Sequence, residues 1–204
     1  LFLFLLTFLP IIIYEQGLGK TLQVIGLLSA VMQRSTAYNY RTRTRRKCLH
    51  PALVVCPRSV ALQWEQEFQK FAKNFFRIHV YNREQILGRI ATKKLLNALK
   101  KQHVDVVVMS YSSFLRTHEA MAPLADWCCV VFDEVHMLKG KTTKISLASN
   151  AVDCQRRFGL TGTVMQNTYE ELWMLLNWAR PGTIYRSINL CMHILKSLYQ
   201  YEYM

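Results

Sequence analysis

A short glycine-containing segment near the beginning of the chain has the residue types of a phosphate-binding loop. It stands between a β-like apolar run at residues 11–14 and a helical pattern that starts at Leu22. Glycines let backbone N–H groups turn toward phosphate oxygens, and a helix N-terminus adds the positive end of its dipole. The lysine of such a loop reaches the β- and γ-phosphates, and its threonine hydroxyl ligates Mg²⁺. The pattern therefore predicts an ATP and Mg²⁺ cradle made of Gly17, Leu18, Gly19, Lys20 and Thr21.

The cradle pattern is incomplete, which leaves a second interpretation open. The full pattern G-x-x-x-x-G-K-[ST] begins with a glycine, and here Tyr14 occupies that position. A Gly-Lys-Thr run also occurs in tight structural turns. The position of this run between a strand and a helix favours the nucleotide interpretation, with Lys20 as a catalytic cation and Thr21 as a metal ligand.

A pair of carboxylates stands at the end of a later apolar run. Residues 128–136 read Cys-Cys-Val-Val-Phe-Asp-Glu-Val-His. An aspartate at the end of a strand can hold Mg²⁺ through water, and a neighbouring glutamate can orient and polarise an attacking water. We therefore predict that Asp133 holds the metal and that Glu134 acts on the water, both as catalytic residues. A solvated turn is the alternative for this pair, and His136 either relays the state of the nucleotide or caps the strand end.

Apolar β-rich runs alternate with helical patterns along the chain and frame both motifs. Runs such as Ala-Leu-Val-Val-Cys at 52–56 are apolar throughout, which is typical of strands covered on both faces of a parallel sheet. The sequence therefore predicts an α/β fold with a doubly wound, mostly parallel sheet in three layers. Ligands bind such sheets beyond the carboxyl ends of the strands, where both motifs fall. The expected strands are 11–14, 52–56, 77–81, 104–109, 128–132 and 157–160, and the expected helices are 20–33, 59–73, 84–101, 111–118, 143–151 and 169–178.

The charge balance indicates a polyanionic partner. The chain has 26 Lys plus Arg against 13 Asp plus Glu, a net charge of +13. Such a surplus favours nucleic acid first and an anionic membrane second. The densest charge is the run Arg-Thr-Arg-Thr-Arg-Arg-Lys at 41–47, in a polar segment that we interpret as a surface loop. This run is either a DNA contact, a solvated face or a nuclear-import signal.

The cysteines and the two ends of the chain exclude some classes of protein. No pair of the six cysteines has C-x-x-C spacing, which argues against a zinc site and indicates reduced, intracellular thiols. Residues 1–10 are almost entirely apolar, but this stretch is too short to span a bilayer and lacks the features of a signal peptide. We expect no membrane association, a truncated or mis-spliced start, and a divergent tail at 183–204.

Several ordered motifs together carry a resemblance to a known family. Gly-Leu-Gly-Lys-Thr, Cys-Pro-Arg-Ser-Val (56–60), Met-Ser-Tyr-Ser-Ser-Phe-Leu (109–115), Asp-Glu-Val-His and Leu-Thr-Gly-Thr (160–163) stand in that order, with Gln-Asn at 166–167 and the pair 63–64 as further matches. Together they resemble the first lobe of Swi/Snf-family ATPases, in the DEAH-box-like superfamily 2. The ending Asn-Trp-Ala-x-Pro-Gly at 177–182 is most similar to the excision-repair, Cockayne syndrome B-related branch. The resemblance covers residues 11–182 and implies one RecA-like P-loop NTPase lobe.

The resemblance implies roles for matched positions beyond the cradle and the acidic pair. Residues 161–163 would couple the nucleotide site to DNA movement. Residues 57–59 and 110–111 would lie along the track of the DNA backbone. For Ser59 the alternative is a helix cap, and for Tyr111 it is core packing. The family places arginine fingers and the opposite face of the ATP cleft on a second RecA-like lobe, which this chain does not contain.

The chain departs from the family pattern at several positions. An acidic residue is usual where Tyr14 stands and a methionine where Gln16 stands, while Gly140 and Val164 replace an asparagine and a proline. The leading hypothesis is the ATP-binding lobe of a nuclear, DNA-dependent ATPase or translocase acting on double-stranded DNA or chromatin in remodelling or repair. Because a second lobe is missing, we expect this chain alone to be inactive in hydrolysis. The alternative is a non-catalytic nucleotide- or DNA-binding fragment of a degraded gene.

Overall fold

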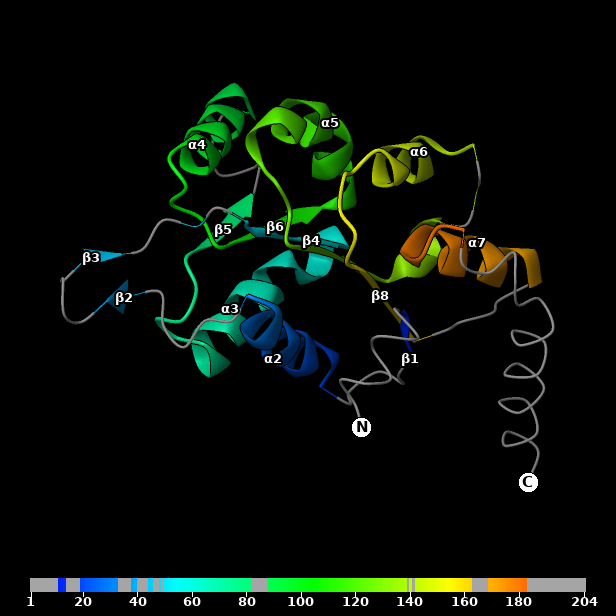
Figure 1. Ribbon diagram of the computed structural model, residues 1–204, viewed down its shortest axis with the longest axis horizontal. Helices are drawn as coiled ribbons and strands as arrows, with labels where there is room; N and C mark the ends of the chain where they lie inside the picture. Colours follow the sequence, from blue (N-terminus) through cyan, green and yellow to red (C-terminus); the bar gives the residue numbers. More distant parts are fainter. Residues whose placement is uncertain are drawn as a thin grey trace.

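The computed structural model contains a central parallel sheet of six strands (Figure 1). It describes residues 11–13, 19–32, 38–39, 44–45, 48, 50–81, 88–138, 140, 142–162 and 169–182. The strand order across the sheet is β1-β8-β7-β4-β6-β5, and every neighbouring pair is parallel. This confirms the α/β class. The strands are β1 (Ile11–Ile13), β4 (Ala52–Cys56), β5 (Ile78–Tyr81), β6 (Val106–Ser110), β7 (Cys129–Asp133) and β8 (Arg157–Thr161).

Helices cover both faces of this sheet, with α2 and α3 on one side and α4, α5 and α6 on the other (Figure 1). The helices are α2 (Lys20–Val31), α3 (Ala61–Phe71), α4 (Gly88–Lys100), α5 (Tyr111–Met121), α6 (Lys144–Asn150) and α7 (Tyr169–Ala179). Three short 3₁₀ helices also connect elements: η1 (Arg58–Val60), η2 (Ala122–Leu124) and η3 (Val135–Leu138). The result is the predicted three-layer arrangement.

Strand β4 explains why the sheet strands are apolar throughout. All five of its residues are buried, and successive side chains point to opposite faces. Leu53 and Val55 join the core cluster with α4 and α5, whereas Ala52, Val54 and Cys56 join the cluster with α2 and α3. A strand between two helical layers has no solvent face, so no alternation of polar residues is needed.

The polar segment before β4 differs in part from its interpretation as a loop. Two short strands, β2 (Tyr38–Asn39) and β3 (Thr44–Arg45), pair antiparallel there. The interpretation of the whole segment as a surface loop was therefore wrong at these four residues, which form strands. Of the basic run at 41–47, the structure describes Thr44 and Arg45, which form β3. The remaining residues of the run lie outside the described residues.

The structure does not describe the two ends of the sequence. Residues 1–10 and 183–204 lie outside the described residues, so the predictions made for them stay predictions. Within the part of the chain that the structure describes, every helix is too short or too polar to cross a membrane.

Candidate functional site

The cradle residues and the acidic pair meet at the carboxyl edge of three neighbouring strands. Helix α2 begins with Lys20 and follows β1, while Asp133 ends β7 and Thr161 ends β8. Strand β8 lies between β1 and β7, so these three carboxyl ends are adjacent. Both motifs were expected at this edge from the sequence. The frame thus brings Lys20 to the same edge as the carboxylates.

The described part of the cradle has the backbone shape that a phosphate loop requires. Gly19 precedes α2 with φ of 73°, in the left-handed region that favours glycine. Its carbonyl accepts the first hydrogen bond of the helix, from Gln23 N at 3.1 Å. Lys20 and Thr21 are half-buried in the first turn, where backbone N–H groups have no partner within the helix. Gly17 and Leu18 lie outside the described residues.

The Asp133 carboxylate is half-buried, and both of its oxygens accept hydrogen bonds. Burial raises its pKa above the ordinary value, and the charge of Glu134 acts in the same direction. The Trp64 indole N–H donates to Oδ2 at 3.0 Å, the Glu134 backbone N–H donates to Oδ1 at 3.0 Å, and both bonds lower the pKa. The Lys20 ammonium also lowers it. The net direction is upward, so the charged form of Asp133 is costly here and depends on these donors.

Trp64 is a contact of the site that sequence reasoning did not assign. The residue matched the family pattern, but no role was drawn from it. Its burial could be read from the spacing, because Trp64 and Phe68 lie one turn apart on the buried face of α3. Its hydrogen-bond partner could not be predicted from the spacing, because Asp133 lies 69 residues away along the chain.

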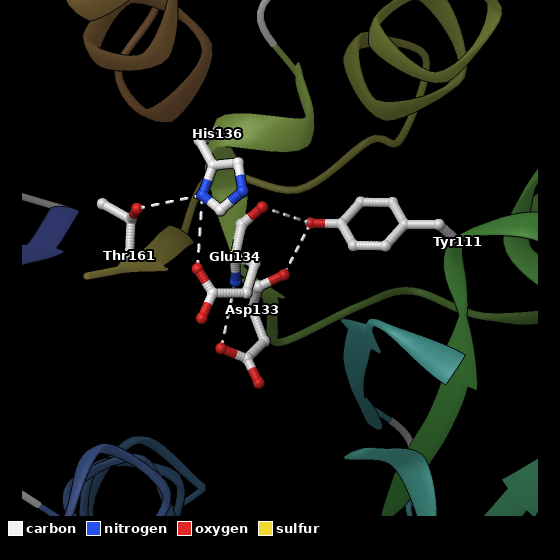
Figure 2. Close-up of polar contacts among 5 residues, drawn as sticks. All are labelled: Tyr111, Asp133, Glu134, His136 and Thr161. Atoms are coloured by element: carbon white, nitrogen blue, oxygen red, sulfur yellow. Dashed lines mark hydrogen bonds and ion pairs between the residues drawn. The ribbon is translucent and has the colours of Figure 1, made fainter. Parts of the chain in front are cut away.

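Glu134 takes an unusual backbone conformation directly after the strand. Its φ is 53°, which is uncommon for a residue with a Cβ and costs about 1–3 kcal/mol. The turn is held by Tyr111, whose hydroxyl donates to the carbonyl of Asp133 at 2.7 Å and approaches that of Glu134 at 3.3 Å (Figure 2). Burial raises the pKa of Tyr111 well above its ordinary value, as do the nearby carboxylates, so this hydroxyl remains a donor.

Close packing fixes the segment that follows. Helix η3 begins at Val135, and a Cβ on Gly159 would lie 2.9 Å from a methyl carbon of Val135. Glycine at this position therefore lets η3 lie against β8. The side chain of His136 is thereby brought beside the end of β8.

His136 joins the acidic pair to the end of β8. Its Nδ1 atom lies 3.2 Å from Glu134 Oε2 and 3.2 Å from Thr161 Oγ1 (Figure 2). When Nδ1 carries a proton it can donate to Glu134, and when it does not it can accept from the threonine hydroxyl. The geometry links Glu134 to the first threonine of the Thr-Gly-Thr motif, as the expected relay would require. Thr163 lies outside the described residues.

The two alternatives raised for the expected DNA track have different outcomes. The helix-cap interpretation of Ser59 was wrong, because Ser59 lies exposed within η1 and the N-cap residue of α3 is Val60, without a side-chain bond. Tyr111 is only 8% exposed and packs edge-on against Phe132, so core packing describes it. A role for either residue toward DNA stays a prediction.

The donor set fits magnesium bound together with a nucleotide. Among the described residues, no three His, Cys, Asp or Glu side chains converge into a metal cage. Magnesium is usually bound by one or two carboxylates, water and substrate phosphates, rather than by a cage of protein ligands. Asp133 and Thr21, which lie at the same strand edge, would hold such an ion. The bound ion would neutralise phosphate charge.

The fold and the strand-edge site are those of a RecA-like ATPase core. A family model, the SNF2-related domain, matches residues 10–193, and the chain belongs to this family. Switch 2 of Arabidopsis thaliana is 36% identical over 178 residues, covering 83% of this chain and 19% of that protein. DNA excision repair protein ERCC-6-like 2 of Mus musculus is 30% identical, covering 83% of this chain and 11% of that protein.

A solved structure supports the same conclusion. The SWI2/SNF2 ATPase core of Sulfolobus solfataricus in complex with double-stranded DNA is 29% identical, with a TM-score of 0.63. The match covers 84% of this chain and 31% of that chain. The chain therefore spans less than a third of each of these three relatives. Proteins of this family are ATPases, and relatives of this chain act in chromatin remodelling and DNA repair.

Proposed function

We propose that this chain is the ATP-binding lobe of a DNA-dependent ATPase that acts in chromatin remodelling or repair. The observation that carries the proposal is the convergence of Lys20, Asp133 and Glu134 at one strand edge. Two of these groups already interact, since the Lys20 charge lowers the pKa of Asp133. A cation and two carboxylates at one strand edge are the arrangement that a Mg²⁺–nucleotide complex needs.

Each residue has a distinct role in this proposal. Gly17, Leu18, Gly19 and Lys20 surround the phosphates, and Thr21 and Asp133 hold Mg²⁺. Glu134 orients the attacking water, and His136 passes the state of Glu134 to Thr161. We expect negligible turnover by this chain alone, because an arginine finger supplies about 10³–10⁵ in rate and the family carries its fingers on a second lobe.

Double-stranded DNA is the proposed partner. The net charge of +13 and the DNA complex of the Sulfolobus solfataricus relative support it. Nothing in the sequence is built to read base edges, so we expect salt-sensitive binding without sequence preference. A protein that acts on chromatin also implies location in the nucleus, and the chromatin-remodelling names of relatives support this part of the proposal.

The experiment is a thermal-shift titration of the 204-residue chain with ADP or ATP and Mg²⁺. Ligand that binds the native state raises its stability, so the melting temperature should rise with nucleotide concentration. Lys20→Ala should abolish the rise, and Lys73→Ala, an exposed lysine beyond the end of α3, should leave it unchanged. An equal rise in the wild type and in Lys20→Ala would contradict the proposed nucleotide site.

A further inference from the structure

A second pocket lies far from the nucleotide site, between α4 and α5. It opens to solvent, has a volume of about 540 Å³, and includes Tyr81 of β5 in its lining. Helices α4 and α5 lie side by side over this end of the sheet (Figure 1). Strand β5 and strand β1 form opposite edges of the sheet, about 24 Å apart at a strand spacing of about 4.8 Å. The pocket is therefore separate from the cradle that follows β1.

Three cationic side chains line this pocket, and among the described residues no carboxylate lines it. Arg89 and Lys93 come from α4, and Arg116 comes from α5. All three are exposed, and within the described part of the chain neither Arg89 nor Lys93 forms an ion pair. Arg116 makes a long contact of 3.5 Å to Ser113 Oγ. The three charges are thus available to an anion that enters from solvent.

The charge pattern of α4 is unfavourable for the helix itself. Arg89 and Lys93 are four residues apart on one face, and like charges at this spacing cost about 0.2–0.5 kcal/mol. The helix contains no acidic residue that would offset them. Surface helices usually mix both signs, so this face is better suited to binding an anion than to stabilising the fold.

Neutral hydrogen-bonding groups complete the lining. The hydroxyls of Tyr81 and Thr92 lie 2.9 Å apart, and either can donate. Guanidinium groups bind phosphate with two parallel N–H donors, and lysine adds a compact charge. The volume is in the range of small-molecule pockets, about 300–1,000 Å³, so there is room for more than one phosphate group.

We propose that the pocket formed by Arg89, Lys93, Arg116 and the Tyr81–Thr92 hydroxyl pair binds phosphate groups. Two sources have this chemistry: the backbone of a nucleic acid and a free polyphosphate. The nucleic-acid source rests on the proposed function, whereas the phosphate chemistry itself does not.

The test uses the full chain with Lys20→Ala, so that phosphate binding at the nucleotide cradle is suppressed. In this background the pocket variant replaces Arg89, Lys93 and Arg116 by Ser. The matched control replaces Lys94, Lys100 and Lys101 by Ser, which removes the same charge at exposed positions on or just after α4 that do not line the pocket. Calorimetric titration with pyrophosphate should show affinity reduced by about tenfold or more in the pocket variant and nearly unchanged in the control.

A second arm measures duplex DNA binding against salt concentration. If backbone phosphates enter the pocket, the pocket variant should have a shallower slope than the control, by about 0.9 for each phosphate that the pocket no longer neutralises. An unchanged slope together with abolished pyrophosphate binding assigns the pocket to a free polyphosphate. Circular dichroism checks folding, and the milder single variant Lys93→Gln replaces the triple variant if that unfolds. Equal reductions of pyrophosphate affinity in the pocket variant and the control would overturn the proposal. Binding of polyglutamate as tight as that of pyrophosphate would also overturn it, and neither result depends on whether the cradle binds nucleotide.

Discussion

The hydrogen bond from Trp64 to Asp133 provides a quantitative test of how the acidic pair is held. Trp64 is 2% exposed, and its N–H donates to an oxygen of the half-buried Asp133 carboxylate at 3.0 Å. Trp64→Phe keeps an aromatic ring beside Phe68 and removes the donor. A hydrogen bond to a charged group contributes about 1.5–3 kcal/mol, and the small cavity adds about 1 kcal/mol. We therefore expect the free energy of unfolding to fall by about 2.5–4 kcal/mol.

Trp178 offers a matched control for the change in side-chain volume. It is 4% exposed, packs edge-on against Phe132, and within the described residues its Nε1 atom has no hydrogen-bond partner. Trp178→Phe removes the same atoms without removing a hydrogen bond, so the free energy of unfolding should fall by about 1 kcal/mol or less. Urea unfolding of both variants then separates the hydrogen bond from the packing.

The dependence on pH identifies the carboxylate as the partner. Burial raises the pKa of Asp133 in the native state, so stability is lost as the pH rises from the unfolded pKa through the raised native one. The Trp64 bond offsets part of this loss by favouring the charged form. The excess cost of Trp64→Phe over Trp178→Phe should therefore be full above the raised native pKa of Asp133 and shrink as the pH falls through it. Equal costs in both variants, or a pH-independent difference, would refute the reasoning.

Three further expectations concern catalysis, DNA and thiol chemistry. The chain alone should show negligible ATP turnover even with duplex DNA. In a chain joined to a relative's second lobe, Glu134→Gln should remove turnover while the thermal shift with nucleotide persists. Robust turnover by the chain alone, or by the Glu134→Gln fusion, would count against the proposed roles. Changing Arg41, Arg43, Arg45, Arg46 and Lys47 to Ser should flatten the salt dependence of duplex binding if that segment touches DNA, and an unaltered slope would assign it to a solvated face or an import signal. Burial, with a contribution from Asp133, raises the pKa of the Cys56 thiol to about 12, so iodoacetamide at neutral pH should leave Cys56 unmodified in the native protein, as peptide mass spectrometry would detect; rapid labelling would mean that β4 opens readily.

The sheet and its helices could be predicted because each strand has two buried faces. Runs such as 52–56 and 106–109 are continuous and apolar, so they stand out between amphipathic helices. The boundaries were less predictable where polar contacts decide them. The strand expected from residue 104 begins at Val106, because the buried Asp105 accepts from the backbone and guanidinium of Arg77 before the ladder starts. No periodicity encodes that ion pair.

In the site, too, the positions that follow strands could be predicted from the sequence, whereas the long-range polar contacts could not. Lys20 and Asp133 could be expected at one edge, since both follow strands of a parallel sheet and all carboxyl ends of such a sheet share an edge. The partners Trp64 and Tyr111 could not be expected, because hydrophobic spacing indicates that a residue is buried and not which polar group it reaches. Both residues use an aromatic body for the core and a single donor for the acidic turn.

The acidic turn gathers several features that oppose folding when taken singly. Asp133 is a half-buried carboxylate with a raised pKa, and Glu134 has a left-handed backbone that is costly for any residue with a Cβ. Hydrogen-bond donors from α3 and α5 hold this turn in place, and these two helices belong to opposite layers of the domain. A movement of either helix relative to the sheet would change the orientation of a carboxylate. Since α3 begins directly after η1, where Arg58 and Ser59 are exposed, α3 and its Trp64 connect this exposed segment to the acidic pair.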